Sequence, residues 1–307
     1  MLRSAGLLCA VFVTISLFSC GPRKGAGPAG PRPKGPLALD EARLYVLELI
    51  NRDRAEEGLE PVELDDTATE AGQRHSDDMA HHGFTAHLGT DGSVPEQRYS
   101  EAGGTDMAQE NAACFFDAVE RPLDPEPMFL PEELEKIEYA FISEVPPNDG
   151  HRRNILKAIH NKVGIGLSKP KDVKEVCMAQ EFVDDYGDYG KLPKKAKVGQ
   201  VIEVEGELRE PMHFGGVGLA RIDHAKPITP EALNGTGGYT FPSPFVVYFP
   251  AGYKTPKPVE VDGKRFRIEI PLTDKGRPGR YEVNILAAPD AKAKAFEPIA
   301  ITTIDVR

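Results

Sequence analysis

The sequence predicts an α+β protein with two domains, the first made of helices and a small sheet and the second an all-β sandwich. Up to about residue 186, apolar residues recur at helical spacing. Beyond that point, alternating runs typical of strands are separated by Gly, Pro and Asp turns. The chain has 307 residues, 40% of them hydrophobic, and is long enough for two cores. We therefore expect domains at 38–186 and 199–307, joined by a linker at 187–198.

Two amphipathic helices are expected at the start of the first domain. The first is expected to begin at an N-cap Asp40 and to end before Gly58. The second is expected to use Asp66 as its N-cap and to stop at Gly83. Their apolar faces are formed by Leu44, Leu47 and Ile50 in the first helix and by Ala68, Gly72, His75 and Met79 in the second.

Shorter elements complete the first domain. Apolar spacing and the position of prolines predict helices at 112–119 and 134–144 and one short helical turn at 151–156. Two strands joined by a turn are expected at 163–167 and 176–182. The domain therefore mixes helices with a sheet.

The second domain is predicted from period-two patterns alone. Several short strands with regular turns describe an antiparallel sandwich. The segment 279–285, Gly-Arg-Tyr-Glu-Val-Asn-Ile, is similar to the penultimate-strand region of immunoglobulin-like domains, which favours that class. The predicted strands lie at 201–208, 245–249, 266–272, 281–286 and 299–306.

The N-terminus predicts export. Residues 1–20 combine Arg3, an uncharged apolar run and small residues, the parts of a secretory signal. Their ending, Leu-Phe-Ser-Cys, resembles the lipobox of bacterial lipoproteins, so we expect Cys20 to anchor the protein to a lipid membrane on the periplasmic or extracellular side. Ordinary secretion with nearby cleavage is the alternative. Residues 21–37, rich in Pro and Gly, are expected to form a tether.

The net charge and the cysteine content exclude some partners and some metal sites. A net charge of -11 argues against nucleic acid as a partner, because such binding neutralises phosphates. Outside the signal segment, only Cys114 and Cys177 remain, and in an exported protein we favour one disulfide between them over two free thiols. No Cys-x-x-Cys pair is present to suggest a thiolate zinc site.

Three polar residues in turn-rich segments are the candidates for chemistry. His87, Glu110 and His151 are groups that bind metals or move protons. Taken one at a time, each is explained by a cap or a turn. Elsewhere, we expect His75 to be a half-buried core residue and His160 to be structural.

Several motifs occur in the order found in one known family. They are I-N-R-D-R-A-E-E-G-L-E-P-V-E-L-D, H-S-D-D-M-A, H-x-x-x-D-G, x-E-N, D-G-H-R-R-N-I-L, V-G-I-G and Q-E-F. Together they make residues 40–185 resemble a CAP domain, of the cysteine-rich secretory protein, antigen 5 and pathogenesis-related 1 superfamily, in its bacterial branch. The resemblance implies a CAP-type α-β-α sandwich with a cavity that holds two histidines and two acidic residues.

The resemblance assigns that cavity residue by residue. His87, Glu110 and His151 match its motifs directly, and Glu144 is carried over as the second acid. Glu144 stands three positions after the place where eukaryotic members have Trp and this chain has Phe. A second departure is Gln109, where the family usually has Gly. Asn111, Arg152 and Asn154 are expected to orient His151 through hydrogen bonds to the backbone around it.

Two functions follow from these candidates. The interpretation that we favour is a binding or interaction module of the cell envelope, which takes a small apolar ligand, a glycan or an envelope protein. Zinc or another divalent metal is expected at His87, His151 and Glu110. The alternative is a hydrolase in which that metal activates water and Glu110 acts as base. A third interpretation assigns binding to the sandwich. Fold alone assigns no catalytic residue.

Overall fold

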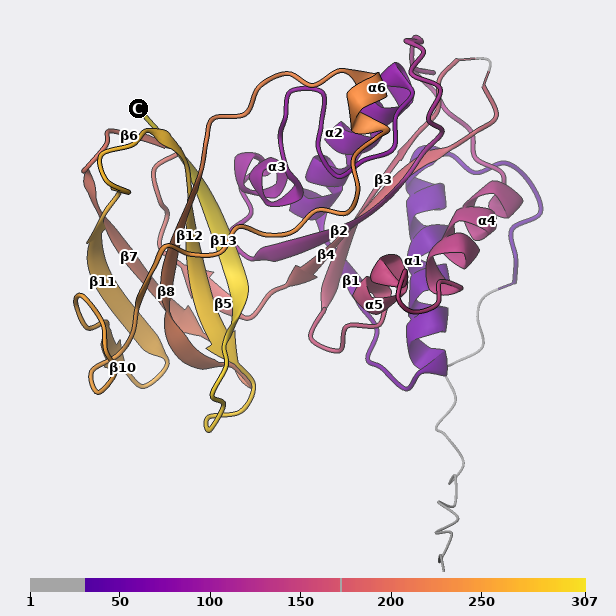
Figure 1. Cartoon of the computed structure of the whole chain (residues 1–307). Coiled ribbons are helices and arrows are strands. Elements are labelled where there is room, and N and C mark those ends of the chain that lie inside the picture. Colours follow the sequence, from indigo (N-terminus) through magenta and orange to yellow (C-terminus); the bar gives the residue numbers. More distant parts are fainter. Residues whose placement is uncertain (1–30, 172) are drawn as a thin grey trace, which may run out of the picture.

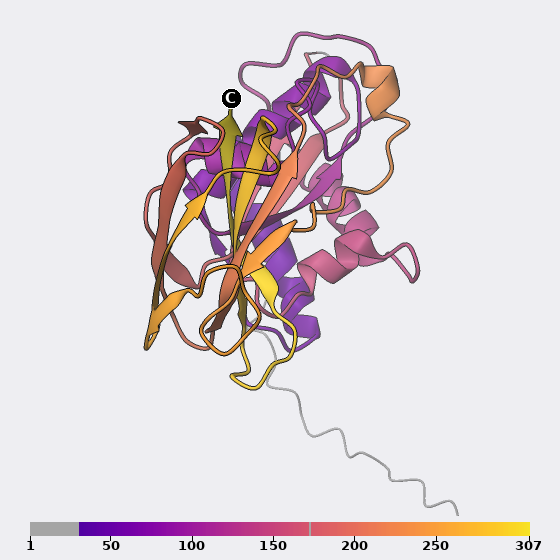
Figure 2. The same cartoon turned by 60° about the vertical axis from the view of Figure 1, so that its left-hand side comes forward.

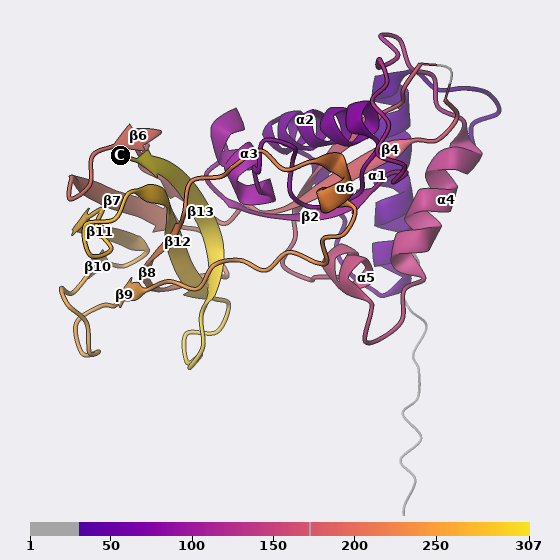
Figure 3. The same ribbon diagram turned by 45° about the horizontal axis from the view of Figure 1, so that its top comes forward.

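The first domain is a sheet covered by helices on both faces (Figures 1 and 3). The computed structural model describes residues 31–171 and 173–307, so the predicted signal at 1–20, with Cys20, and residues 21–30 of the predicted tether lie outside the described residues. The end of that tether is corrected, because Arg32 donates to Glu135 at 2.6 Å and Leu37 forms a β-bridge with Phe129. The sheet has the order β1-β3-β4-β2, which makes β2 an edge strand. Its strands are β1 (Glu63–Leu64), β2 (Met107–Ala113), β3 (Lys162–Ser168) and β4 (Cys177–Asp184).

Helices α1 and α4 bury one face of this sheet, and α2 covers the other. One core cluster joins Val46 and Ile50 of the first helix to Ile165 and Phe182 of the strands. These layers confirm the predicted α-β-α sandwich. The helices are α1 (Leu39–Glu56), α2 (Asp66–His82), α3 (Pro95–Ala102), α4 (Pro131–Ile142) and α5 (Gly150–Ile155).

The two glycines of the Val-Gly-Ile-Gly motif let α2 lie directly on β3. A Cβ atom at Gly164 would stand 2.0 Å from the carbonyl carbon of Ala68, and one at Gly166 would stand 2.2 Å from that of Gly72. Helix and strand therefore meet backbone to backbone, and any larger side chain would separate the two layers.

The helix ends differ slightly from the prediction. Helix α1 begins one residue before Asp40, which lies in the first turn rather than at the cap. The side chain that caps α2 is Asp65, not Asp66, and it accepts a hydrogen bond from the amide of Ala68 at 2.8 Å. Gly83 ends α2 in the left-handed conformation, with φ at 68°, as predicted.

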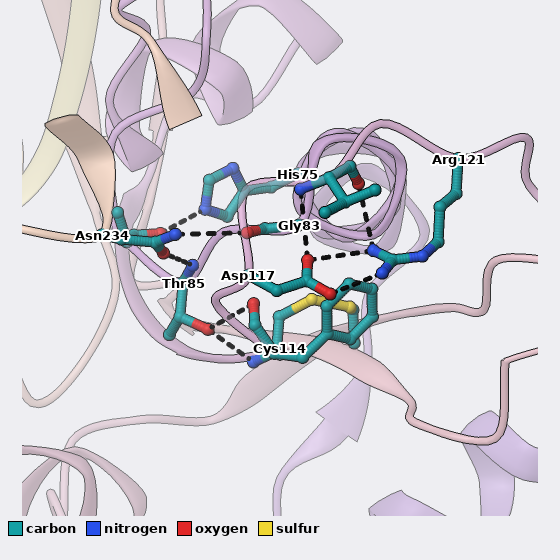
Figure 4. The surroundings of a disulfide bond; sticks show 11 residues. His75, Gly83, Thr85, Cys114, Asp117, Arg121 and Asn234 are labelled. Atoms are coloured by element: carbon teal, nitrogen blue, oxygen red, sulfur yellow. Dashed lines mark hydrogen bonds and ion pairs between the residues drawn. A yellow bond between two sulfur atoms is a disulfide. The ribbon is translucent and has the colours of Figure 1, made fainter. Parts of the chain in front are cut away.

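The helix predicted at 112–119 is wrong. Residues Met107–Ala113 form β2, and the residues that follow are irregular. Glu110 lies opposite Glu181 in the antiparallel ladder with β4, so its neighbours alternate between the two faces of the sheet. The apolar run was misread because a short buried stretch has the same composition in either state. Next to it, Cys114 and Cys177 form the expected disulfide, with Cα atoms 4.2 Å apart (Figure 4).

The second domain is the predicted sandwich. Its sheets have the orders β10-β11-β7-β5 and β6-β13-β12-β8-β9. Seven of these strands follow the A, B, E, D and C, F, G order of immunoglobulin domains, and β6 and β9 are added at the two edges of the second sheet. The strands are β5 (Gly187–Tyr189), β6 (Lys195–Ala196), β7 (Val201–Leu208), β8 (His213–Ile222), β9 (Val246–Tyr248), β10 (Glu260–Asp262), β11 (Arg265–Pro271), β12 (Gly279–Ala288) and β13 (Glu297–Val306).

Tyr281 fixes one corner of this sandwich. Its hydroxyl accepts from the amide of Asp274 at 2.8 Å and donates to the carbonyl of Arg277 at 2.7 Å. A tyrosine at the start of the penultimate strand that bonds the preceding turn is a feature of immunoglobulin-type sandwiches. The similarity noticed at 279–285 therefore has a structural counterpart.

The linker predicted at 187–198 is also corrected. These residues include β5, which pairs with β7, and β6, which pairs with β13, so they belong to both sheets of the sandwich. The Gly, Pro and Lys content suggested a linker, but short edge strands tolerate such residues. The domains are directly joined: α3 packs on β13, where the amide of Thr303 donates to the Ser100 hydroxyl at 3.1 Å.

The β8–β9 connection returns to the first domain. Residues 223–245, which we name the strap, run across α2 and α3 and carry the short helix α6 (Pro230–Leu233) (Figures 1 and 2). Leu233 is fully buried in a cluster with Met79 and Phe84 of the first domain. The strap thus gives the first domain part of its core. In the described part of the chain, no helix is both long enough and apolar enough to span a membrane.

The close approach of α2 to β3 gives a first prediction. Gly166→Ala should lower the free energy of unfolding by about 1–3 kcal/mol, because the methyl group overpacks the contact with Gly72. Urea unfolding of the variant and of Gly35→Ala, whose added Cβ meets nothing within 4 Å, measures the difference. Equal stability of the two variants would contradict the account.

Candidate functional site

A cavity of about 870 Å³ lies along the edge strand β2. Three parts of the chain meet around it: the turn after α2, the segment that leads into α5, and the strap. All four residues predicted for the family's cavity line it. They are His87, Glu110, Glu144 and His151.

His87 is held by a buried pair of charges. Its Nδ1 donates to Oε1 of Glu110 at 2.9 Å, and the other carboxylate oxygen accepts from Arg98 at 2.6 Å. Arg98 also donates to the carbonyls of His87 and Ser93, both at 3.1 Å. The side chains of Glu110 and Arg98 are 0% and 1% exposed, so each charge depends on the other. This arrangement fixes both the ring and the turn of His87.

His151 is held in the same way by Glu144. Its Nδ1 donates to one carboxylate oxygen at 2.6 Å, and its main-chain amide donates to the other at 2.8 Å. The ring of Phe141 lies against the imidazole, with centroids 4.5 Å apart. Glu144 therefore orients the ring and also satisfies an amide at the start of α5.

The two imidazoles face one another across the cavity, with ring centroids 6.4 Å apart. Because each Nδ1 carries a hydrogen toward a carboxylate, the neutral ring presents an unprotonated Nε2. Burial lowers the pKa of both histidines; Arg98 lowers that of His87 further, while Glu144 raises that of His151 in part. At neutral pH the cavity thus contains two neutral rings, each oriented as a hydrogen-bond acceptor.

Beside His87 lies a second buried carboxyl group, the glutamate of the Q-E-F motif, which was not predicted to belong to the cavity. Glu181 stands directly opposite Glu110 in the sheet and is fully buried. Burial and the neighbouring Glu110 raise the pKa of Glu181 well above its ordinary range. Arg98 and His87 stabilise a negative charge on Glu110. Of the two carboxyl groups, Glu110 is therefore ionised and Glu181 is protonated.

His75 also lies closer to this site than expected. Its side chain is fully buried rather than half-buried, and its Nε2 stands 3.7 Å from the Glu110 carboxylate. The same nitrogen donates to the carbonyl of Ala86 at 2.7 Å. Burial keeps its pKa well below the ordinary value of 6.5, so it is a neutral structural group.

The residues predicted to orient His151 form hydrogen bonds around its main chain. Asn111 donates to the carbonyl of His151 at 3.3 Å, and Asn154 donates to the side chain of Asn111 at 3.0 Å. Arg152 donates to the carbonyl of Ile142 at 2.8 Å. These contacts position the turn of His151 and do not touch its ring. His160 is buried on Asp184 and is structural, as expected.

The predicted metal set does not fit this geometry. Among the residues that the structure describes, no three His, Cys, Asp or Glu side chains are arranged to hold a metal ion. Glu110 cannot serve as the third ligand because His87 and Arg98 occupy its two oxygens. For the same reason, Glu110 is not available as the general base of a hydrolase. Of the three predicted ligands, His87 and His151 each keep one ring nitrogen, Nε2, that could bind a metal.

Comparison with known proteins agrees with the fold. Residues 47–182 match the model of the Cysteine-rich secretory protein family, CAP. These residues form a CAP domain. No curated protein sequence matches this chain.

Solved structures give more distant matches to this CAP protein. An extracellular protein with an SCP domain from Bacillus anthracis is 19% identical, with a TM-score of 0.36; the match covers 50% of this chain and 45% of that one. An outer surface protein from Borrelia burgdorferi is 17% identical, with a TM-score of 0.37, over 48% of this chain and 96% of that one. This CAP protein therefore spans less than half the length of the first of these structures.

Arg98 provides a direct test of how the site is held. Arg98→Met should lower the free energy of unfolding by about 3–5 kcal/mol, because it leaves the buried Glu110 without its countercharge. Arg74→Met is the matched control: its ion pairs with Asp91 and Glu101 are exposed, so its loss should cost about 1 kcal/mol or less. Chemical denaturation compares them, and a similar loss in both variants would contradict the buried pair.

Titration of the imidazoles tests the electrostatics. The Cε1 proton resonances of His87 and His151 should titrate below pH 6.5, and Glu144→Gln should lower the pKa of His151 further. Since unfolded histidines take up protons at about pH 6.5 and these two buried rings do so only at lower pH, the fold should lose stability as pH falls below that value. A rise in the pKa of His151 in Glu144→Gln would show that the assigned contact is wrong.

Proposed function

We propose that this CAP protein is exported and binds a small ligand in the cavity between His87 and His151. The observation that carries the proposal is the pair of neutral imidazoles on one cavity, each fixed through Nδ1 by its own carboxylate. The volume of about 870 Å³ lies within the usual range of about 300–1,000 Å³ for ligand sites. Such a pre-formed set of acceptors suits a ligand that donates hydrogen bonds.

Export is supported from two directions. The sequence of residues 1–20 has the parts of a secretory signal, and the disulfide between Cys114 and Cys177 suits an oxidising compartment. We extend the proposal to a lipid anchor at Cys20, with the residues between Cys20 and Arg32 as the tether that carries the folded part away from the membrane. The ligand then comes from the cell envelope, as a small apolar molecule, a glycan or a segment of an envelope protein.

A divalent metal is the weaker proposal for this cavity. Only the Nε2 atoms of His87 and His151 remain to bind it, and a zinc site generally needs at least three protein ligands. A metal-dependent hydrolase also lacks its proposed base, since Glu110 is paired with Arg98. A ligand that donates hydrogen bonds fits the two acceptor nitrogens better than a cation does.

The experiment follows the imidazole resonances of His87 and His151 while probes are added to the full chain. The probes are chitotriose, a soluble oligosaccharide; palmitate, an apolar chain; and zinc chloride. We expect one organic probe to shift both resonances in a saturable manner, because both rings face the same cavity. His224, which pairs with Asp305 on the sandwich, is the internal control and should not move. If only His224 shifts, or if zinc alone shifts the two cavity histidines, the proposal fails.

A further inference from the structure

Part of the wall of the cavity comes from the second domain. Thr236, Gly237, Gly238, Tyr239 and Phe241 of the strap line it, together with residues of the CAP domain. The rings of Tyr239 and Phe241 lie edge to face, with centroids 5.6 Å apart. The strap therefore adds two aromatic surfaces to a site whose other walls are mainly polar.

The strap is fixed just before this wall and within it. Before it, the side chain of Asn234 accepts from the amide of Thr85 at 2.9 Å and donates to the carbonyl of Gly83 at 3.2 Å (Figure 4). Thr85 in turn accepts at 3.0 Å from the amide of Cys114, a disulfide residue. Within the wall, the hydroxyl of Tyr239 donates to the buried carboxylate of Glu96. The wall is thus attached to the same helix, α3, that carries Arg98.

The chemistry of the two sides points to one class of ligand. The CAP side offers the acceptor Nε2 atoms of His87 and His151 and the amide group of Asn148. An acyl chain or sterol ring would leave these groups without partners, which is costly in a partly closed site. A sugar satisfies both sides, since its hydroxyl and acetamido groups donate and accept at the edges while its C–H face packs on an aromatic ring.

We propose that the strap completes the ligand site and that its rings, Tyr239 and Phe241, select a short oligosaccharide. This inference rests on the proposed function, because it assigns the ligand class of the same cavity. It gives the sandwich a direct part in recognition: the CAP domain supplies polar contacts, and the second domain supplies the stacking surface. Removal of either ring should weaken saccharide binding without disturbing the imidazoles.

The chain offers a specific reporter for this test because it contains no Trp. Phe241→Trp places the sole indole in the cavity wall, and its emission should change in a saturable manner when chitotriose is added. Tyr239→Ala and Phe241→Ala should each bind chitotriose about tenfold more weakly, as followed by the His87 and His151 resonances. Tyr239→Phe keeps the ring and should bind within about threefold of the unchanged chain, since it loses only the contact with Glu96.

Tyr253→Ala is the matched control, because this ring is 60% exposed on a loop of the sandwich and does not line the cavity. Thermal unfolding of each variant confirms that it is folded. If chitotriose shifts both histidines but Tyr239→Ala and Phe241→Ala bind as tightly as the control, the role of the strap is overturned while the proposed function stands. If palmitate shifts them and chitotriose does not, the saccharide is overturned. If no probe shifts them, both proposals fail.

Discussion

The buried pair between Arg98 and Glu110 is the interaction on which the site depends. Neither charge is exposed, so helix α3 and edge strand β2 are held together by groups that cannot separate without a large loss of stability. The pair also sets the charge on Glu110, which holds the ring of His87, and leaves the neighbouring Glu181 as the protonated member. One helix thereby determines the electrostatics of one side of the cavity.

The same helix connects the site to the second domain. Its Glu96 accepts from Tyr239 of the strap, its Gln97 accepts from Arg280, and its Ser100 accepts from β13. Between α3 and the sandwich, Glu282 is fully buried, and burial beside Glu96 raises its pKa to about 8. The junction of the two domains is therefore polar and tightly packed, and the cavity is built by both of them rather than by the CAP domain alone.

Family motifs predicted the positions of His87, Glu110, Glu144 and His151, because these residues lie in short segments with recognisable neighbours. Arg98 was missed because α3 is short and polar and has no apolar stripe. Glu181 was included in the Q-E-F motif, but its place in the site was missed because its segment has the composition of a buried strand, in which the position of a charged group is known only once its partner across the ladder is known. Tyr239 and Phe241 lie in a Gly- and Pro-rich segment whose path over the first domain follows from tertiary packing and not from local pattern.

The most direct test of the account is a crystal structure of the full chain with chitotriose. We expect one sugar unit to lie in the cavity with its hydroxyl or acetamido groups within hydrogen-bond distance of Nε2 of both His87 and His151, and with a ring of the strap packed on its C–H face. Arg98 and Glu110 should keep their contact, since the site is formed before the ligand arrives. A sugar bound on the sandwich alone, or an imidazole of His87 turned away from Glu110 in the complex, would contradict the account.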